Sequence, residues 1–256
     1  MKKNTYIGIA VIFVIIAGIT FYVATRPLPA KAPGTTGAGI ILPAKGYAEH
    51  ATYYDIVANY ASSTPLRNSA SPLADATARS LMYGYVRDTI ATFKTEGNFD
   101  NLTSEDIKAM GFDQGRKEKL QIAYLIASSP RTVSYIFTIY EDTLGAHGNT
   151  FFKTFTFNTK TGAPLALTDI FSGDYLNTLS SLARAKLPAI IGDAADTTFI
   201  KSGTMPETKN FENFFFDNKD FVILFAPYAV ASYSSGPQTL RIKLSELTSI
   251  LKPEYR

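Results

Sequence analysis

Only two histidines occur among the 256 residues, and one of them, His147, lies in the stretch EDTLGAHGNTFF, residues 141–152. An imidazole titrates near neutral pH and often serves as a general acid, a general base or a metal ligand. Glu141, Asp142 and His147 could in principle converge on a metal. Zinc, however, usually takes three or four ligands at short spacing, and no second histidine is near. We therefore expect no metal and no cofactor.

Support for a nucleophile is equally weak. The chain has no Gly-x-Ser-x-Gly motif, and the closest stretch, SSGP at residues 234–237, is typical of a turn. The absence of cysteine excludes thiol catalysis, disulfides and a lipid-modified cysteine. No glycine-rich loop suited to phosphate is present. We expect a protein that is not an enzyme, and a metal-dependent hydrolase or deacetylase is the less favoured alternative.

The simplest interpretation of LGAHGN is a connection between two strands. Gly145 and Gly148 would take backbone angles that other residues avoid, and His147 would be a turn residue. Loops on a rigid sheet also often carry recognition groups, so His147 and Asn149 are candidate ligand-binding residues at one edge of the sheet.

Tyrosines could also take part in recognition, because the chain has 15 of them. Tyr228 and Tyr233, in the stretch APYAVASYSSGP at residues 226–237, suit contacts with carbohydrate or protein, although most tyrosines are expected in the core. Gly236 and Pro237 end this stretch and predict a structural turn.

An uncharged apolar run at the N-terminus is the strongest single signal in the sequence. Residues 4–25 read NTYIGIAVIFVIIAGITFYVAT, and a helix of this length would be roughly 33 Å long, enough to cross a bilayer core of about 30 Å. We expect a cytoplasmic end at residues 1–5, a transmembrane anchor at 6–25, and an extracytoplasmic remainder, because two lysines precede the run. A cleaved signal peptide is the alternative, but its apolar region is normally shorter.

The rest of the chain is close to neutral. Three residues, Lys2, Lys3 and Arg26, account for the formal charge of +3. Without a basic cluster we expect no nucleic-acid partner. Prolines and glycines dominate residues 26–46, which predicts an extended tether between the membrane and the folded domain.

The N-terminal part of the ectodomain is expected at residues 47–115. Alternating apolar residues predict a strand in the second half of residues 47–62, with His50 exposed at its start. A helix is predicted from Ser71 and Pro72 to Gly97, and a shorter one from Thr103 to Gly111 with a TSED capping box.

The C-terminal part of the ectodomain, residues 116–256, changes to a strand pattern. A second amphipathic helix is predicted at residues 174–190, where Pro188 would end or bend it. Strands interrupted by helices predict an α+β fold with a mainly antiparallel sheet, packed by two amphipathic helices. The predicted strands lie within residues 119–128, 131–142, 149–158, 162–171, 211–218, 220–227 and 238–247.

These segments resemble a known family. Residues 133–171, with Gly145-Ala146-His147 and a KTG turn, and residues 214–247, with Pro227-Tyr228, are similar to the extracytoplasmic domain shared by RsiV anti-sigma factors and PdaC peptidoglycan deacetylases. This domain is known as domain of unknown function 3298. The strand and helix upstream resemble its companion, domain of unknown function 4163. The resemblance covers about residues 47–251.

The resemblance implies a binding domain of the cell envelope, whose partner in the anti-sigma relatives is lysozyme. We do not expect either relative's own activity, because an anti-sigma factor needs a longer cytoplasmic segment than MKKNT and a deacetylase needs a further catalytic domain. The sequence therefore predicts a membrane-anchored domain that recognises a cell-wall glycan, peptidoglycan, or a wall-acting protein such as lysozyme. The alternative is a structural or assembly protein of the envelope.

Overall fold

The computed structural model describes residues 40, 42–43, 46–61 and 72–256. The predicted transmembrane segment 6–25 lies outside the described residues, as do most of the tether and the predicted N-cap Ser71. Within the described part of the chain, no helix is both long and apolar enough to cross a membrane. Residues Gly39–Arg256 form one compact unit, which contains all the elements discussed below.

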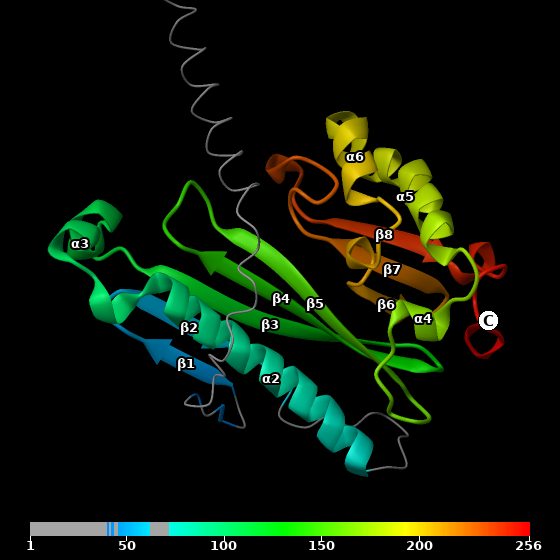
Figure 1. Cartoon of the computed structure of the whole chain (residues 1–256), viewed down its shortest axis with the longest axis horizontal. Helices are drawn as coiled ribbons and strands as arrows, with labels where there is room; N and C mark the ends of the chain where they lie inside the picture. Colours follow the sequence, from blue (N-terminus) through cyan, green and yellow to red (C-terminus); the bar gives the residue numbers. More distant parts are fainter. Residues whose placement is uncertain (1–39, 41, 44–45, 62–71) are drawn as a thin grey trace, which may run out of the picture. The chain divides into compact units, whose positions relative to one another are not determined.

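A mixed five-stranded sheet, in the order β1-β2-β3-β4-β5, is the larger layer of this unit (Figure 1). All neighbours are antiparallel except β2 and β3, which are parallel. A parallel pair needs a long crossover, and here the described part of the crossover contains two α-helices. The strands are β1 Tyr47–His50, β2 Tyr54–Ala58, β3 Glu118–Ser128, β4 Thr132–Asp142 and β5 Asn149–Asn158.

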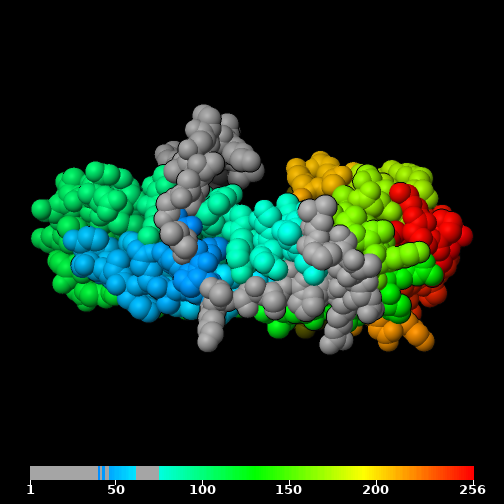
Figure 2. All heavy atoms as spheres, turned by 90° about the horizontal axis from the view of Figure 1, so that it is seen from below, coloured from blue at the N-terminus to red at the C-terminus, as the bar shows by residue number. Residues whose placement is uncertain are grey.

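The crossover helix α2, Pro72–Gly97, covers one face of this sheet (Figure 1). Figure 2 shows α2 in cyan beside β1 and β2 in blue. Because residues alternate between faces along a strand, one face of β3 and β4 packs on the helix. The shared core contains Ile56, Met82, Val86, Ile90, Phe93, Leu120, Ile122, Tyr135, Phe137 and Phe157.

The second crossover helix, α3, spans Ser104–Met110 and has both predicted ends. Thr103 and Asp106 form the capping box: the Asp106 amide donates to Thr103 Oγ1 at 3.1 Å, and the Thr103 amide donates to Asp106 Oδ2 at 2.9 Å. Gly111 closes the helix with a left-handed backbone, φ 72°. The sequence prediction for this helix is confirmed.

A separate antiparallel sheet, in the order β6-β7-β8, forms the second layer, with its own helices and core. Its strands are β6 Phe214–Asp217, β7 Asp220–Phe225 and β8 Gln238–Lys243, and its helices are α4 Leu167–Ile170, α5 Tyr175–Ile191 and α6 Thr197–Gly203. The core that α5 shares with this sheet contains Leu179, Ala183, Leu187, Phe214, Phe221, Ile223, Leu240 and Ile242.

The two sheets meet along β4, β5 and β6. Two threonines of β5 bond to the chain around β6: the Phe214 amide donates to Thr154 Oγ1 at 3.0 Å, and Thr156 Oγ1 donates to the Phe214 carbonyl at 3.1 Å. A small core of Ile136, Phe215 and Val222 fills the contact. The second sheet therefore covers only one end of the five-stranded sheet's other face.

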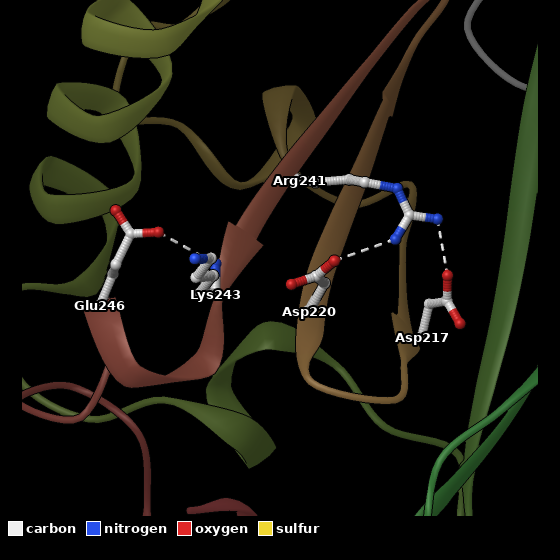
Figure 3. A network of polar contacts seen from close by, with 5 residues as sticks. All are labelled: Asp217, Asp220, Arg241, Lys243 and Glu246. Atoms are coloured by element: carbon white, nitrogen blue, oxygen red, sulfur yellow. Dashed lines mark hydrogen bonds and ion pairs between the residues drawn. The ribbon is translucent and has the colours of Figure 1, made fainter.

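Arg241 of β8 bridges the tight turn between β6 and β7 (Figure 3). Its guanidinium donates to Asp217 at 2.6 Å and to Asp220 at 3.0 Å, across the turn that contains Asn218 in a left-handed conformation. Beyond β8, the Lys243 amide donates to the Glu246 carboxylate at 3.1 Å. These contacts link all three strands at one end of the small sheet.

The α+β class and the mainly antiparallel pairing are confirmed, but the strands form two sheets rather than one, and β2 pairs parallel with β3. The strand predicted in the second half of residues 47–62 is β2, and a short strand, β1, precedes it and pairs with it. His50 is exposed at the end of β1 and contacts Asp55 at 2.9 Å. The helix predicted at residues 174–190 is α5, and Pro188 does not end it, because α5 continues to Ile191.

The segment 162–171 is not a strand. It makes two isolated bridges, Phe157 with Pro164 and Phe171 with Leu251, and contains the short helix α4. Leu167, Ile170 and Phe171 are buried together at helical rather than alternating spacing.

Candidate functional site

A cluster of three rings joins the loop between β4 and β5 to the segment between β7 and β8. His147 stacks on Tyr233, with 3.6 Å between ring centroids and 18° between ring planes. His147 Nε2 lies 3.2 Å from the Tyr228 hydroxyl, and the rings of Tyr228 and Tyr233 are 5.5 Å apart. We call His147, Tyr228 and Tyr233 the ring cluster. The structure thus brings together three of the four candidate ligand-binding residues.

The loop at residues 143–148 joins β4 to β5 (Figure 1). It turns at Leu144, three residues before His147. Leu144 has a left-handed backbone, φ 61°, and its amide donates to Asp142 Oδ1 at 3.0 Å. The expectation that Gly145 and Gly148 take such angles was wrong, since neither has a positive φ. An Asp that bonds the amide two residues ahead supports the turn without glycine.

Position 148 requires glycine because the Tyr140 side chain packs closely against it, and not because of its backbone angle. It is buried, and a Cβ atom at this position would lie 2.4 Å from the Tyr140 hydroxyl. Its carbonyl accepts a bond from the Tyr233 hydroxyl at 2.6 Å and lies 3.1 Å from His147 Nδ1. Gly148 therefore lies between the ring of Tyr140 and the ring cluster.

The segment between β7 and β8 holds the two tyrosines at unequal depth. Tyr228 is 52% exposed and has a left-handed backbone, φ 68°, which is costly for a residue with a Cβ atom. Tyr233 begins the short 3₁₀ helix η5, Tyr233–Ser235, and is half-buried. Gly236, φ 66°, follows as the predicted turn residue. An exposed aromatic ring on a strained backbone is a frequent feature of binding sites.

Asn149, the fourth candidate, is exposed at the first position of β5, opposite Glu141. Within the described residues its side chain makes no hydrogen bond to the ring cluster, although it adjoins Gly148 in the chain. Pro237 is exposed just before β8.

A groove of about 360 Å³ lies beside the ring cluster, on the face of the five-stranded sheet that α2 does not cover. Its polar side chains belong to Asn59, Gln121, Thr138 and Tyr140. None of these four makes a side-chain hydrogen bond to another described residue. Val57 and Ala123 add apolar surface between them. We call this surface the sheet groove.

Tyr140 connects the two features, because it lines the sheet groove and its ring contacts Gly148 at the base of the ring cluster. The combined surface carries no charged side chain among the groove-lining residues and the three rings. Sequence reasoning identified the rings but missed Asn59, Gln121 and Thr138. Their signal was available: Gln121 and Thr138 are neutral polar residues at strand positions facing away from the α2 core, and Asn59 directly follows β2.

The site offers little for acid–base or metal chemistry. Among the described residues, no three histidine, aspartate or glutamate side chains are close enough to hold a metal ion, and Glu141, Asp142 and His147 are no exception. The nearest groups to the imidazole are two tyrosine rings and a carbonyl. Stacking and neutral hydrogen bonding are what this arrangement can supply.

Fold and site together define an α+β domain with two sheets, in which two loops carry a neutral aromatic surface. Residues 168–245 match the family model described as protein of unknown function, DUF3298. This region is therefore similar to the DUF3298 family, in agreement with the resemblance seen in the sequence. The 4163-type assignment of the N-terminal part stays a prediction.

A curated relative is the peptidoglycan-N-acetylmuramic acid deacetylase PdaC of Bacillus subtilis, 36% identical over 143 residues. The match covers 55% of this chain and 31% of that enzyme. The chain is thus a distant homologue of PdaC that spans less than a third of its length.

Two solved structures of the DUF3298 family are similar. One, from Bacteroides fragilis, has 17% identity and a TM-score of 0.52, covering 81% of this chain and 91% of that one. The other, from Pseudomonas aeruginosa, has 13% identity and a TM-score of 0.47, and the match covers 84% of this chain and 97% of that chain. The first likeness shows a shared fold.

Proposed function

We propose that this protein is a non-catalytic binding domain of the cell envelope that recognises an uncharged stretch of cell-wall glycan. The observation that carries the proposal is that the ring cluster and the sheet groove, linked through Tyr140, both lack charged side chains. A sugar ring presents an apolar face that packs on aromatic rings and hydroxyl groups that pair with amides and hydroxyls. The surface supplies both kinds of group side by side.

The unpaired polar groups of the groove support this ligand class. Asn59 and Gln121 present amides that can donate and accept at once, and Thr138 and Tyr140 present hydroxyls. None of these groups bonds to another described side chain or backbone group, so a glycan hydroxyl can pair with them without breaking a contact in the described part of the chain. The residues that line the groove and the three rings offer no counter-charge to an acidic or basic ligand.

The relationship to PdaC supports an envelope setting, since that protein is a peptidoglycan deacetylase. We further propose the arrangement expected from the sequence: a single N-terminal membrane span at residues 6–25, a cytoplasmic N-terminus, and this domain outside the membrane. The absence of a nucleophile motif and the surroundings of His147 support a role in binding rather than catalysis.

Retention of the detergent-purified full chain on insoluble peptidoglycan tests the proposal. We expect the wild-type protein to co-sediment, and the Tyr228→Ala and Gln121→Ala variants to lose retention by about 10-fold each. Leu125→Ala is a matched control, because Leu125 is a 70% exposed strand residue that lies outside the groove lining. Equal retention of all four proteins, or none of the wild type, would reject a glycan site here.

A wall-acting protein such as lysozyme is the other partner that the resemblance implies. The same assay separates the two: a protein partner would be captured from solution in the absence of glycan, and added chitooligosaccharide would not compete. A purely structural envelope role predicts co-purification of membrane proteins with no effect of Tyr228→Ala.

A further inference from the structure

The hydrogen bonds within the ring cluster have fixed donors and acceptors. The Gly148 carbonyl can only accept, so the Tyr233 hydroxyl donates to it at 2.6 Å. His147 Nδ1 lies 3.1 Å from the same oxygen and must therefore carry a proton. The two lone pairs of one carbonyl thus accept from a phenol and from an imidazole. This carbonyl determines which nitrogen of His147 is protonated.

The tautomer of His147 in turn fixes the hydroxyl of Tyr228. In a neutral imidazole only one nitrogen is protonated, so Nε2 has a free lone pair. The Tyr228 hydroxyl lies 3.2 Å from Nε2 and donates to it. The opposite tautomer would place the Nδ1 lone pair against a carbonyl oxygen, which is repulsive. One chain of hydrogen bonds therefore runs from Tyr228 through His147 to Gly148, where it meets the bond from Tyr233.

Both tyrosine hydroxyls of the ring cluster have thus given their hydrogens to the protein. Only their oxygen lone pairs are left for a ligand, and lone pairs can only accept. Tyr228 is the more accessible of the two, since it is 52% exposed and Tyr233 is half-buried. The sheet groove differs, because the amides of Asn59 and Gln121 can both donate and accept. The acceptor-only character therefore belongs to the ring cluster and not to the whole surface.

Charged and titratable groups around the loop do not change these roles. Arg116 and Asp142 bond to the backbone of Leu144, at 3.4 and 3.0 Å. Glu141 is beside Asp142 on β4, and the preceding residue, Tyr140, packs against the loop. Within the described part of the chain, none of these four side chains forms an ion pair or a hydrogen bond with the imidazole. The partners of its two nitrogens are a carbonyl and a phenol.

We propose that the ring cluster selects a ligand group that donates a hydrogen bond, and that His147 is the positioning residue that sets this selectivity. The inference rests on the proposed function, because it concerns the same surface. In a cell-wall glycan the donors are sugar hydroxyls and the N–H of an acetamido group. The ligand is therefore a glycan that presents one of these donors, rather than an ether or a carbonyl, to the Tyr228 oxygen.

A second proton on the imidazole reverses the bond between His147 and Tyr228. Nε2–H then donates to the Tyr228 oxygen, and the hydroxyl hydrogen is released toward the ligand. An imidazole titrates between pH 5 and 8, so the binding of a donor group weakens as the pH falls through this range. The three rings keep their places, because only the direction of one hydrogen bond changes. The pH profile of binding thus separates this role from a purely structural one.

Nitrogen NMR of the histidine-labelled full chain tests the tautomer without any ligand. The His50→Gln variant leaves His147 as the only histidine, so the signals are assigned directly. At pH 8 we expect a protonated Nδ1 and an unprotonated Nε2. The reverse assignment, or an equal mixture of the two tautomers, would overturn the proposal.

The pH dependence of chitotriose binding tests the selectivity, because this sugar has no group that titrates between pH 5 and 8. We expect the wild-type affinity to fall about 10-fold from pH 8 to pH 5. His147→Phe keeps a ring beside Tyr233 but has no nitrogen, so its affinity should not change with pH. Glu118→Gln is the matched control, because burial raises the pKa of Glu118 to about 7 and this variant should keep the wild-type profile. A His147→Phe profile equal to that of the wild type would place the titrating group elsewhere and reject the role of His147.

Tyr228→Phe isolates the acceptor. The ring stays and the oxygen is lost, so we expect affinity about 10-fold below that of the wild type at pH 8, with no pH dependence. Wild-type affinity in this variant would mean that no ligand group donates to the Tyr228 oxygen, which contradicts the proposal. If the NMR spectra show the expected tautomer but chitotriose binds at no pH, the glycan function fails and the assigned directions of the hydrogen bonds are supported.

Discussion

The imidazole of His147 lies parallel to the ring of Tyr233, with centroids 3.6 Å apart, and the Tyr233 hydroxyl donates to the carbonyl of Gly148 at 2.6 Å. One tyrosine thus holds the neighbouring residues of the β4–β5 loop by two different interactions. The loop of the large sheet and the segment of the small sheet are fixed to each other at this point.

The two interactions of Tyr233 can be separated by substitution. Tyr233→Phe keeps the stack and loses the hydrogen bond, so we expect a loss of about 1 kcal/mol in the free energy of unfolding. Tyr233→Ala loses both and should cost about 2 kcal/mol or more. Urea denaturation measures the difference, and a double-mutant cycle with His147→Ala isolates the stack. Equal stability of all variants would mean that the ring cluster does not couple the loops.

Tyr228 tests whether backbone strain is retained for binding. Its φ of 68° has a steric cost for any residue with a Cβ atom and has no such cost for glycine. We expect Tyr228→Gly to be more stable than Tyr228→Ala by about 1 kcal/mol, because both remove the ring but only glycine relieves the backbone. Both should lose glycan retention equally. If Tyr228→Ala is as stable as Tyr228→Gly in urea denaturation, the left-handed conformation is not strained.

Gly148 and Gly145 form a matched pair in one loop. Gly148→Ala would place a Cβ atom 2.4 Å from the Tyr140 hydroxyl, so the ring must move, and we expect a loss of about 1–3 kcal/mol. Gly145→Ala meets nothing within 4 Å and should change stability by less than about 0.5 kcal/mol. Gly148→Ala should also weaken glycan retention, since Tyr140 lines the sheet groove. Similar unfolding midpoints for the two variants would show that the Tyr140 ring can move away from the added Cβ atom without a loss of stability.

The sequence predicted most elements because their signals are local. The Thr103–Asp106 capping box and Gly111 define α3, and alternation on β3 and β4 defines the long strands. Parallel pairing of β2 with β3 was missed because it depends on a crossover that no local pattern reveals. The helix α4 was missed because three buried residues at helical spacing were read as alternation.

The candidate site was predicted only in part, because only some of its residues have a local signal in the sequence. His147, Tyr228 and Tyr233 could be selected from the sequence because they have aromatic rings in predicted connections, whereas their contact with one another is a consequence of the fold. The groove residues Gln121 and Thr138 are ordinary strand residues in the sequence, and Asn59 follows a strand. They become a surface only because the small sheet covers one end of that face and leaves the other open.

The buried carboxylate of Glu118 predicts an unusual pH dependence of stability. Its pKa is raised from the ordinary 4.5 to about 7 by burial and by Glu141 and Asp142. Between these two pH values the folded state binds more protons than the unfolded state, so this group lowers the free energy of unfolding as the pH rises through the window. Its unfavourable contribution is complete above about pH 7 and absent below about pH 4.

Glu118→Gln should therefore stabilise the protein at pH 8 by about 2 kcal/mol and have little effect at pH 4, where the wild-type carboxyl is already neutral. Urea denaturation at the two pH values measures this difference. As a control, Glu212→Gln changes an exposed side chain, and its effect on the free energy of unfolding should be the same at both pH values. If Glu118→Gln destabilises the protein at pH 8, the carboxylate has a partner within the fold and is not held against its charge.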